Sequence, residues 1–128
     1  MPIPHPELNG HIYHVDGNPD IYWIDGGLAR HIVDEPTYHG VFGDSPHNET
    51  NDLLGEIEVG VPLGAGTMLI RAANWKEIYL LDQHKKRFIT SPAAKSGYQL
   101  NGHVHGLSPY VVESIPDGTE FEVPHLVR

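Results

Sequence analysis

The sequence predicts a mainly β fold made of two pseudo-symmetric repeats, each a strand plus a β-hairpin plus a short helix. Three observations predict it. The 128 residues include 14 glycines and 11 prolines, which fall between short apolar segments and indicate frequent turns. No long segment keeps the 3.6-residue period of an amphipathic helix. The chain also matches itself when Ile21 is aligned with Ile78. We expect the repeats to pack as one compact sandwich- or barrel-like domain.

We call the alignment that places Ile21 on Ile78 the self-alignment. It matches Ile-Tyr-Trp-Ile-Asp at 21–25 with Ile-Tyr-Leu-Leu-Asp at 78–82. It also matches further pairs: Ile12 with Leu69, Arg30 with Arg87, Ile32 with Ile89 and Gly40 with Gly97. We therefore predict a single domain over 1–128, with boundaries at 10–65 for repeat one, 66–117 for repeat two and 118–124 for a closing strand. The closing strand should pair back with the first repeat, because this would cover an open sheet edge.

Strands are predicted where Ile, Val, Tyr and Trp cluster between turn residues. These segments are 11–15, 21–25, 28–33, 67–72, 77–82, 86–90, 111–115 and 119–123. In the first hairpin, Gly26 and Gly27 can both adopt the positive φ of a type I′ turn, so a two-residue connection is expected. Gln83 and His84 replace them in the second hairpin, where we expect a weaker or longer turn.

The first hairpin should carry apolar residues on both faces. A two-residue turn places Trp23 on the same face as Arg30, and Tyr22 on the same face as His31. A short helix is expected after each hairpin, with Asp34 or Ser91 as its N-cap and an early proline. Gly40 and Gly97 are expected to end these helices, and 42–53 is expected to be a long exposed loop.

Composition restricts the function. The chain contains no cysteine, which excludes thiol catalysis and disulfides. The net charge is −9, with −10 in residues 1–70 (eleven acidic residues and one arginine) and +1 in residues 71–128, so nucleic acid is not expected as a partner. No apolar run approaches the roughly 20 residues of a membrane span, and no signal peptide is evident. We therefore expect a cytoplasmic protein, or one released without a classical signal peptide.

The repeated pattern resembles a known sequence motif. It consists of G-x-[Ile/Leu], then Ile-Tyr-x-[Ile/Leu]-Asp-x4-Arg-x-Ile, then a short helix that carries proline, and it covers residues 10–43 and 67–100. It is similar to the short tandem "vYlidnGkkrhI"-type repeat of bacterial and archaeal surface or secreted proteins. The resemblance implies a binding or packing module and assigns no ligand.

The ten histidines suggest metal binding or pH sensing. His103 and His105 would point to one side of an extended segment, a spacing that metal sites on strands use. The acidic ligand that a cupin motif requires is absent, because Glu113 lies eight residues beyond His105. No metal site and no cofactor are predicted, and His103 and His105 remain weak candidates.

The sequence shows no motif for catalysis. Gly43-Asp44-Ser45 resembles the opening of a lipase block, but Pro46 follows and no G-x-S-x-G elbow exists. No phosphate-binding loop or dinucleotide fingerprint is present. We therefore predict no catalytic residues and a protein that is not an enzyme.

The favoured candidate site combines aromatic rings with acidic side chains in both repeats. A ring can cover the apolar face of a sugar while a carboxylate or an amide binds its hydroxyls. This predicts a non-catalytic carbohydrate-binding module, lectin-like, with quasi-equivalent sites and a glycan or small-molecule ligand. The predicted ligand-binding residues are Trp23, Asp25, Asn74, Trp75, Tyr79, Asp82 and His84.

Other interpretations of the same residues stay open. The tyrosines can be core residues, and Asp25 with Arg30, like Asp82 with Arg87, can form cross-strand ion pairs worth about 0.2–1 kcal/mol. The first alternative function is a protein-interaction or structural repeat module, with a protein partner or a homo-oligomer. The second is a His-metal enzyme of cupin-like type.

Overall fold

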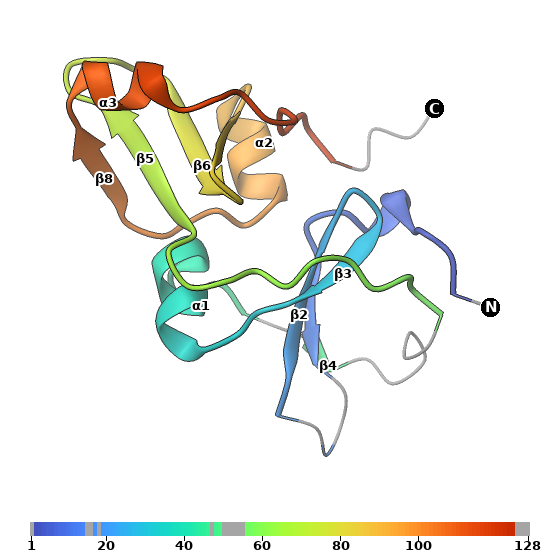
Figure 1. Cartoon of the computed structure of the whole chain (residues 1–128). Coiled ribbons are helices and arrows are strands. Elements are labelled where there is room, and N and C mark those ends of the chain that lie inside the picture. Colours follow the sequence, from blue (N-terminus) through green and yellow to red (C-terminus); the bar gives the residue numbers. More distant parts are fainter. Residues whose placement is uncertain (1, 15–16, 18, 47, 50–55, 125–128) are drawn as a thin grey trace.

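A computed structural model describes residues 2–14, 17, 19–46, 48–49 and 56–124. These residues form two β-sheets with three short α-helices and one 3-10 turn, and the sheets do not close into a barrel (Figure 1). Among the described residues, no helix is long and apolar enough to cross a bilayer. The elements along the chain are η1 (Pro6–Leu8), β1 (Ile12–His14), β2 (Ile21–Asp25), β3 (Leu28–His31), α1 (Glu35–Phe42), β4 (Asn48–Glu49), β5 (Met68–Ala72), β6 (Ile78–Asp82), β7 (Lys85–Phe88), α2 (Pro92–Gly97), β8 (Val104–Leu107) and α3 (Pro109–Ser114).

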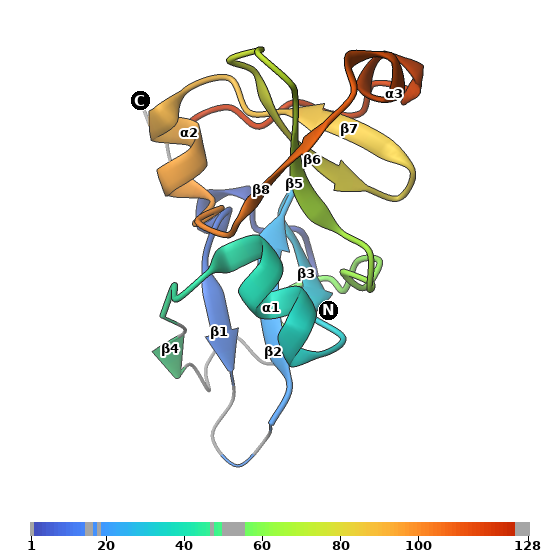
Figure 2. The same cartoon turned by 90° about the vertical axis from the view of Figure 1, so that its left-hand side faces the viewer.

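The two sheets have the same strand order. The first sheet runs β3-β2-β1-β4 and the second runs β7-β6-β5-β8. In each, the three strands nearest the hairpin are antiparallel and the last strand is parallel to its neighbour. A later segment then runs parallel to the outer hairpin strand, through bridges Ala29–Val59 and Ile32–Leu63 in the first half and Lys86–Asp117 and Ile89–Phe121 in the second. Figure 2 shows the second sheet above the first, with α1 in front of β2.

The hairpin predictions are confirmed for β2–β3. Asp25 pairs with Leu28 around a two-residue turn, and both Gly26 and Gly27 have positive φ. For the second hairpin a weaker or longer turn was expected, and the longer turn is wrong. Asp82 pairs with Lys85 directly, and Gln83 and His84 adopt positive φ although neither is glycine. The cross-strand register therefore sets this turn, at a conformation that glycine would adopt with less strain.

The helix starts are confirmed, because the side chains of Asp34 and Ser91 accept the backbone N–H groups of the third helical residues. Gly97 is the last residue of α2, as expected. The predicted end of α1 at Gly40 is wrong. This helix continues to Phe42, and Gly43, with a φ of 63°, is its C-cap.

The predictions for the C-terminal part need correction. Residues 111–114 lie in α3 rather than in a strand, with Ile115 as the C-cap of that helix, and 119–123 contribute only the bridge at Phe121. The expected closing strand does not pair with the first half, since its bridge joins Phe121 to Ile89, directly after β7. The strand β8 was not predicted. Part of the expected loop, Asn48–Glu49, forms β4, whereas 47 and 50–53 lie outside the described residues.

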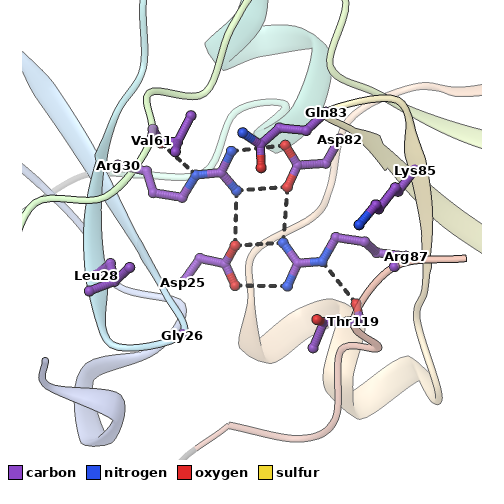
Figure 3. Close-up of a pocket in the computed structure, with 11 residues that line it drawn as sticks. Asp25, Gly26, Leu28, Arg30, Val61, Asp82, Gln83, Lys85, Arg87 and Thr119 are labelled. Atoms are coloured by element: carbon purple, nitrogen blue, oxygen red, sulfur yellow. Dashed lines mark hydrogen bonds and ion pairs between the residues drawn. The ribbon is translucent and has the colours of Figure 1, made fainter.

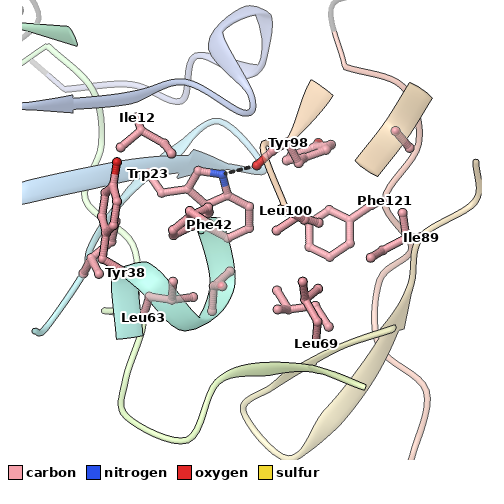
Figure 4. Packing of buried hydrophobic residues seen from close by; sticks show 14 residues of the cluster. Ile12, Trp23, Tyr38, Phe42, Leu63, Leu69, Ile89, Tyr98, Leu100 and Phe121 are labelled. Atoms are coloured by element: carbon pink, nitrogen blue, oxygen red, sulfur yellow. Dashed lines mark hydrogen bonds between the residues drawn. The ribbon is translucent and has the colours of Figure 1, made fainter. Parts of the chain in front are cut away.

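One hydrophobic cluster joins the two halves, and Trp23 lies at its centre (Figure 4). The Trp23 ring lies 5.2 Å from the ring of Phe42, and 5.9 Å from those of Tyr98 and Phe121. Its indole N–H donates to the carbonyl oxygen of Tyr98 at 3.2 Å. Trp23 belongs to the first half, whereas Tyr98 and Phe121 follow the second hairpin. The first half alone could therefore not bury this tryptophan.

Two glycine contacts also join the halves. A Cβ at Gly10 would lie 2.0 Å from the carbonyl oxygen of Gly97, and a Cβ at Gly102 would lie 1.9 Å from that of Gly40. In both cases a backbone carbonyl of a helix occupies the space. The chain can therefore approach each helix this closely only because these positions lack a side chain.

Candidate functional site

The most prominent polar feature is a cluster that we call the ion-pair quartet: Asp25, Arg30, Asp82 and Arg87 (Figure 3). Arg30 binds Asp82 with two nitrogens, at 2.7 and 2.8 Å, and Asp25 with one, at 2.9 Å. Arg87 binds Asp25 with two nitrogens, at 2.5 and 2.9 Å, and Asp82 with one, at 3.0 Å. Each arginine thus forms its bidentate contact with the aspartate of the other hairpin.

The remaining hydrogen bonds of the two arginines stay within their own halves. Arg30 Nε donates to the carbonyl oxygen of Val61 at 2.8 Å, and Arg87 Nε donates to that of Thr119 at 2.8 Å. Two positive and two negative side chains lie together, with side-chain exposures of only 4–12%. Because each charged side chain is hydrogen-bonded to side chains of opposite charge, the free-energy cost of burying the quartet is largely offset.

The pKa of Asp82 reflects this balance. Burial alone would raise it, but hydrogen bonds from and attraction to Arg30 and Arg87 outweigh burial and hold the pKa below its usual value. Burial likewise opposes the charge of both arginines, yet the two carboxylates keep their pKa values above the ordinary one. Asp82 and both arginines are therefore charged at neutral pH.

A pocket of about 510 Å³ opens over the quartet, and Gln83, Lys85 and Thr119 are among its other lining residues (Figure 3). A ligand here would have to compete with bidentate ion pairs for the guanidinium and carboxylate groups. The geometry therefore favours a structural role for the quartet, which fastens one hairpin to the other.

Two further pockets correspond to each other along the sequence. The β2–α1 pocket, of about 240 Å³, is lined by Pro19, Asp20, Ile21, residues 31–35 and Tyr38. The β6–α2 pocket, of about 270 Å³, is lined by Lys76, Glu77, Ile78, residues 88–92 and Lys95. The self-alignment matches every lining position of the first pocket with one of the second. Both pockets lie where a hairpin leads into a helix.

Each of these pockets combines a ring with a carboxylate. His31 and Phe88 occupy equivalent lining positions, and each packs against the tyrosine across its hairpin, with ring centroids 5.5 Å apart for Tyr22 and 5.6 Å apart for Tyr79. The equivalent carboxylates are Asp20 and Glu77. In the first pocket Asp20 lies 3.4 Å from Nε2 of His31.

The predicted ligand-binding residues do not come together in one place. Trp23 is fully buried in the core and presents no face to solvent. Asp25 and Asp82 belong to the quartet and line its pocket. Asp82 and His84 also line a neighbouring pocket of about 280 Å³, with the turn around Gly66.

The remaining predicted residues lie around the second hairpin. Asn74 is exposed with a φ of 68°, and Trp75 is half-buried in the same turn. Neither lines any of the pockets named above. Tyr79 does not line the β6–α2 pocket, but its ring packs on that of Phe88, which does, and lies 5.8 Å from Nζ of Lys86. It therefore supports the pocket rather than lining it.

Of the two weak metal candidates, His105 lies in β8, an edge strand of the second sheet, and His103 directly precedes that strand. His103 and His105 are both exposed, and their ring centroids are 4.7 Å apart. Within the described part of the chain, no three His, Cys, Asp or Glu side chains converge in a way that could hold a metal ion.

Sequence reasoning missed the residues of the paired pockets, although a signal for them existed. The self-alignment extends beyond the hairpins to their polar flanks, where it pairs Asp20 with Glu77 and His31 with Phe88. These pairs keep an acid and a ring at the positions that line the pockets. Neither pair is an identity, so neither stands out beside the identical Asp and Arg pairs of the hairpins.

The fold and the site define a small, mainly β protein with a buried ion-pair quartet and two corresponding pockets. No family model, curated protein or solved structure matches the chain.

Proposed function

We propose that this chain is a tandem of two repeats and works as a non-catalytic, lectin-like binding module. Its binding sites would be the β2–α1 pocket and the β6–α2 pocket. The observation that carries the proposal is their correspondence: all lining positions match in one alignment, and both pockets pair a ring with a carboxylate.

The chemistry of these pockets suits a monosaccharide or one end of a glycan. A ring and aliphatic side chains offer an apolar wall, and Asp20 or Glu77 can accept hydrogen bonds from hydroxyls. Tyr22 and Tyr79 support the rings from behind. Two sites on one chain would also raise avidity for a ligand with repeated units.

The test is binding of a panel of monosaccharides and their methyl glycosides, measured by saturation-transfer NMR and calorimetry. Glu77→Gln should weaken binding of an uncharged sugar in the β6–α2 pocket about tenfold, because a neutral amide oxygen replaces the charged acceptor. Phe88→Leu should weaken it while keeping apolar volume at this position. Glu120→Gln is the control, since Glu120 is exposed and lines none of these pockets.

The binding proposal fails if a folded protein shows no transfer from any sugar. It also fails if the Glu77 and Phe88 variants bind as the parent does. Circular dichroism of each variant would establish that the fold is retained.

A second candidate is a structural or protein-interaction repeat module, and the quartet favours it. The Asp and Arg positions that repeat along the chain bind each other across the two hairpins, so they serve the assembly of repeats. A partner recovered by pull-down and lost with Tyr110→Ser, at a side chain that is 85% exposed, would support this function. A folded Tyr110 variant that keeps the partner would count against that surface.

A further inference from the structure

The two corresponding pockets differ in charge. The β2–α1 pocket carries three carboxylates, from Asp20, Asp34 and Glu35. The β6–α2 pocket carries two ammonium groups, from Lys76 and Lys95, and one carboxylate, from Glu77. The lysines stand where the first pocket has Pro19 and Tyr38, so the charge reverses between the matched pockets.

The two lysines of the β6–α2 pocket are available to a ligand. Neither Lys76 nor Lys95 forms a side-chain hydrogen bond or ion pair with any residue that the structure describes. Lys86 shows the opposite case, since its Nζ donates to the carbonyl oxygen of Ile115 at 2.6 Å and lies 3.0 Å from Asp117. Two ammonium groups that form no ion pair with the described residues thus line one pocket, which also has an apolar wall.

The apolar wall of this pocket consists of Ile78, Phe88, Ile89 and Pro92. The C–H face of a pyranose ring would pack on it and remove apolar surface from water. An anionic group on that ring would meet the two ammonium groups and would be repelled by Glu77, which fixes the orientation of the ligand. A single negative charge matches the net charge of +1 that the two lysines and Glu77 leave at the pocket.

We propose that the β6–α2 pocket selects a sugar that carries one carboxylate, of the uronic acid class. The sugar ring lies on the Phe88 side, the carboxylate is bound by Lys76 and Lys95, and Glu77 accepts hydrogen bonds from hydroxyls. The inference rests on the proposed function and names the ligand class of one of its two sites. The β2–α1 pocket, with three carboxylates, excludes the same ligand by charge repulsion.

The test compares methyl glucuronide with methyl glucoside, which differ in the carboxylate. Titrations on the full chain would follow backbone amide shifts of Thr90 and Ser91 in one pocket and of Val33 and Asp34 in the other. We expect the glucuronide to bind more tightly and to shift only the first pair. Raising the ionic strength from about 0.01 M to about 1 M should weaken this preference, because the Debye length falls from about 30 Å to about 3 Å.

Charge-neutral variants assign the preference to the lysines. Lys76→Gln and Lys95→Gln should each weaken glucuronide binding about two- to fivefold, which is the range of one exposed ion pair, and should leave glucoside binding unchanged. Lys85→Gln is the matched control, because Lys85 is exposed and lines the quartet pocket instead.

The possible outcomes separate the two proposals. Equal binding of glucuronide and glucoside in the β6–α2 pocket overturns the uronic acid inference and leaves the lectin-like function standing. No shift with any sugar overturns both. A sulfated monosaccharide that binds more tightly than the glucuronide also overturns the carboxylate assignment, as does a glucuronide preference that survives in the double lysine variant.

Discussion

Asp82→Asn tests how much the ion-pair quartet stabilises the fold. Asp82 accepts three hydrogen bonds from arginine nitrogens, at 2.7, 2.8 and 3.0 Å, and its side chain is only 4% exposed. The amide removes the charge and leaves two buried guanidinium groups with a single carboxylate. Removing one partner of a buried ion pair costs about 3–5 kcal/mol. That is a large part of the roughly 5–15 kcal/mol that stabilise a domain.

The assay is urea denaturation at neutral pH, followed by tryptophan fluorescence, which reports on the core around Trp23. A loss of this size should also lower the melting temperature by about 10–20 °C for a chain of this length. The matched control is Asp117→Asn. Asp117 lies 3.0 Å from Nζ of Lys86, but its side chain is 82% exposed, so this ion pair should contribute about 0–1 kcal/mol.

A second variant separates charge balance from packing. Replacing the whole quartet, with leucine at both aspartates and methionine at both arginines, leaves no unpaired charge. It should be considerably more stable than Asp82→Asn, since apolar replacements of buried ion pairs are often neutral or stabilising. The reasoning would be refuted if Asp82→Asn cost less than about 1 kcal/mol, or if the quadruple variant were the less stable of the two.

Acidification, a glycine substitution and a tryptophan substitution test other parts of the fold. The pKa of Asp82 is lower in the folded than in the unfolded state. The stabilisation by its carboxylate is therefore present above the unfolded pKa of about 3.9 and is lost as the pH falls through the folded value. Urea midpoints should fall on acidification in the parent protein and fall less in Asp82→Asn. Gly102→Ala should destabilise the fold by about 1–3 kcal/mol or more, because its Cβ would lie 1.9 Å from the carbonyl oxygen of Gly40. Gly106→Ala should not destabilise the fold, because the space around its Cβ is open. Thermal melts of both variants check this. Trp75→Phe should remove the fluorescence that acrylamide quenches, because the remaining Trp23 is buried; strong quenching of that variant would contradict the placement of Trp23.

Local sequence signals predicted the hairpins and the helix starts. Alternating residues and a Gly-Gly turn determine the β2–β3 register, and Asp34 and Ser91 are capping residues next to prolines. Such signals act within a few residues, so no knowledge of the tertiary fold is needed.

The strand prediction at 111–115 shows where local reasoning fails. Two adjacent valines suggested β structure, but Ser108 accepts the N–H of Tyr110 and Pro109 occupies the first helical position of α3. Capping therefore outweighs a weak strand propensity in so short a segment. The strand β8 was missed for a different reason. Its parallel partner β5 lies far earlier in the chain, and a parallel pair gives no local turn signal.

The quartet could be predicted only in part. Each hairpin does contain the expected contact, Asp25 with Arg30 at 2.9 Å and Asp82 with Arg87 at 3.0 Å. The bidentate contacts connect the two hairpins, and they depend on how the sheets pack around Trp23. A pattern within one hairpin holds no information on that packing.

Positions that match in the self-alignment divide into two groups with different roles. The identical acid and arginine pairs form the quartet, where each residue needs its counterpart in the other hairpin, so a change in one half leaves a buried charge unpaired. The pocket positions at which the halves differ form no such reciprocal ion pairs, which allows Pro19 to correspond to Lys76 and the buried Tyr38 to Lys95. The shared charged residues therefore maintain the fold, and under the proposed binding function the ligand choice would depend on the residues at which the two halves differ.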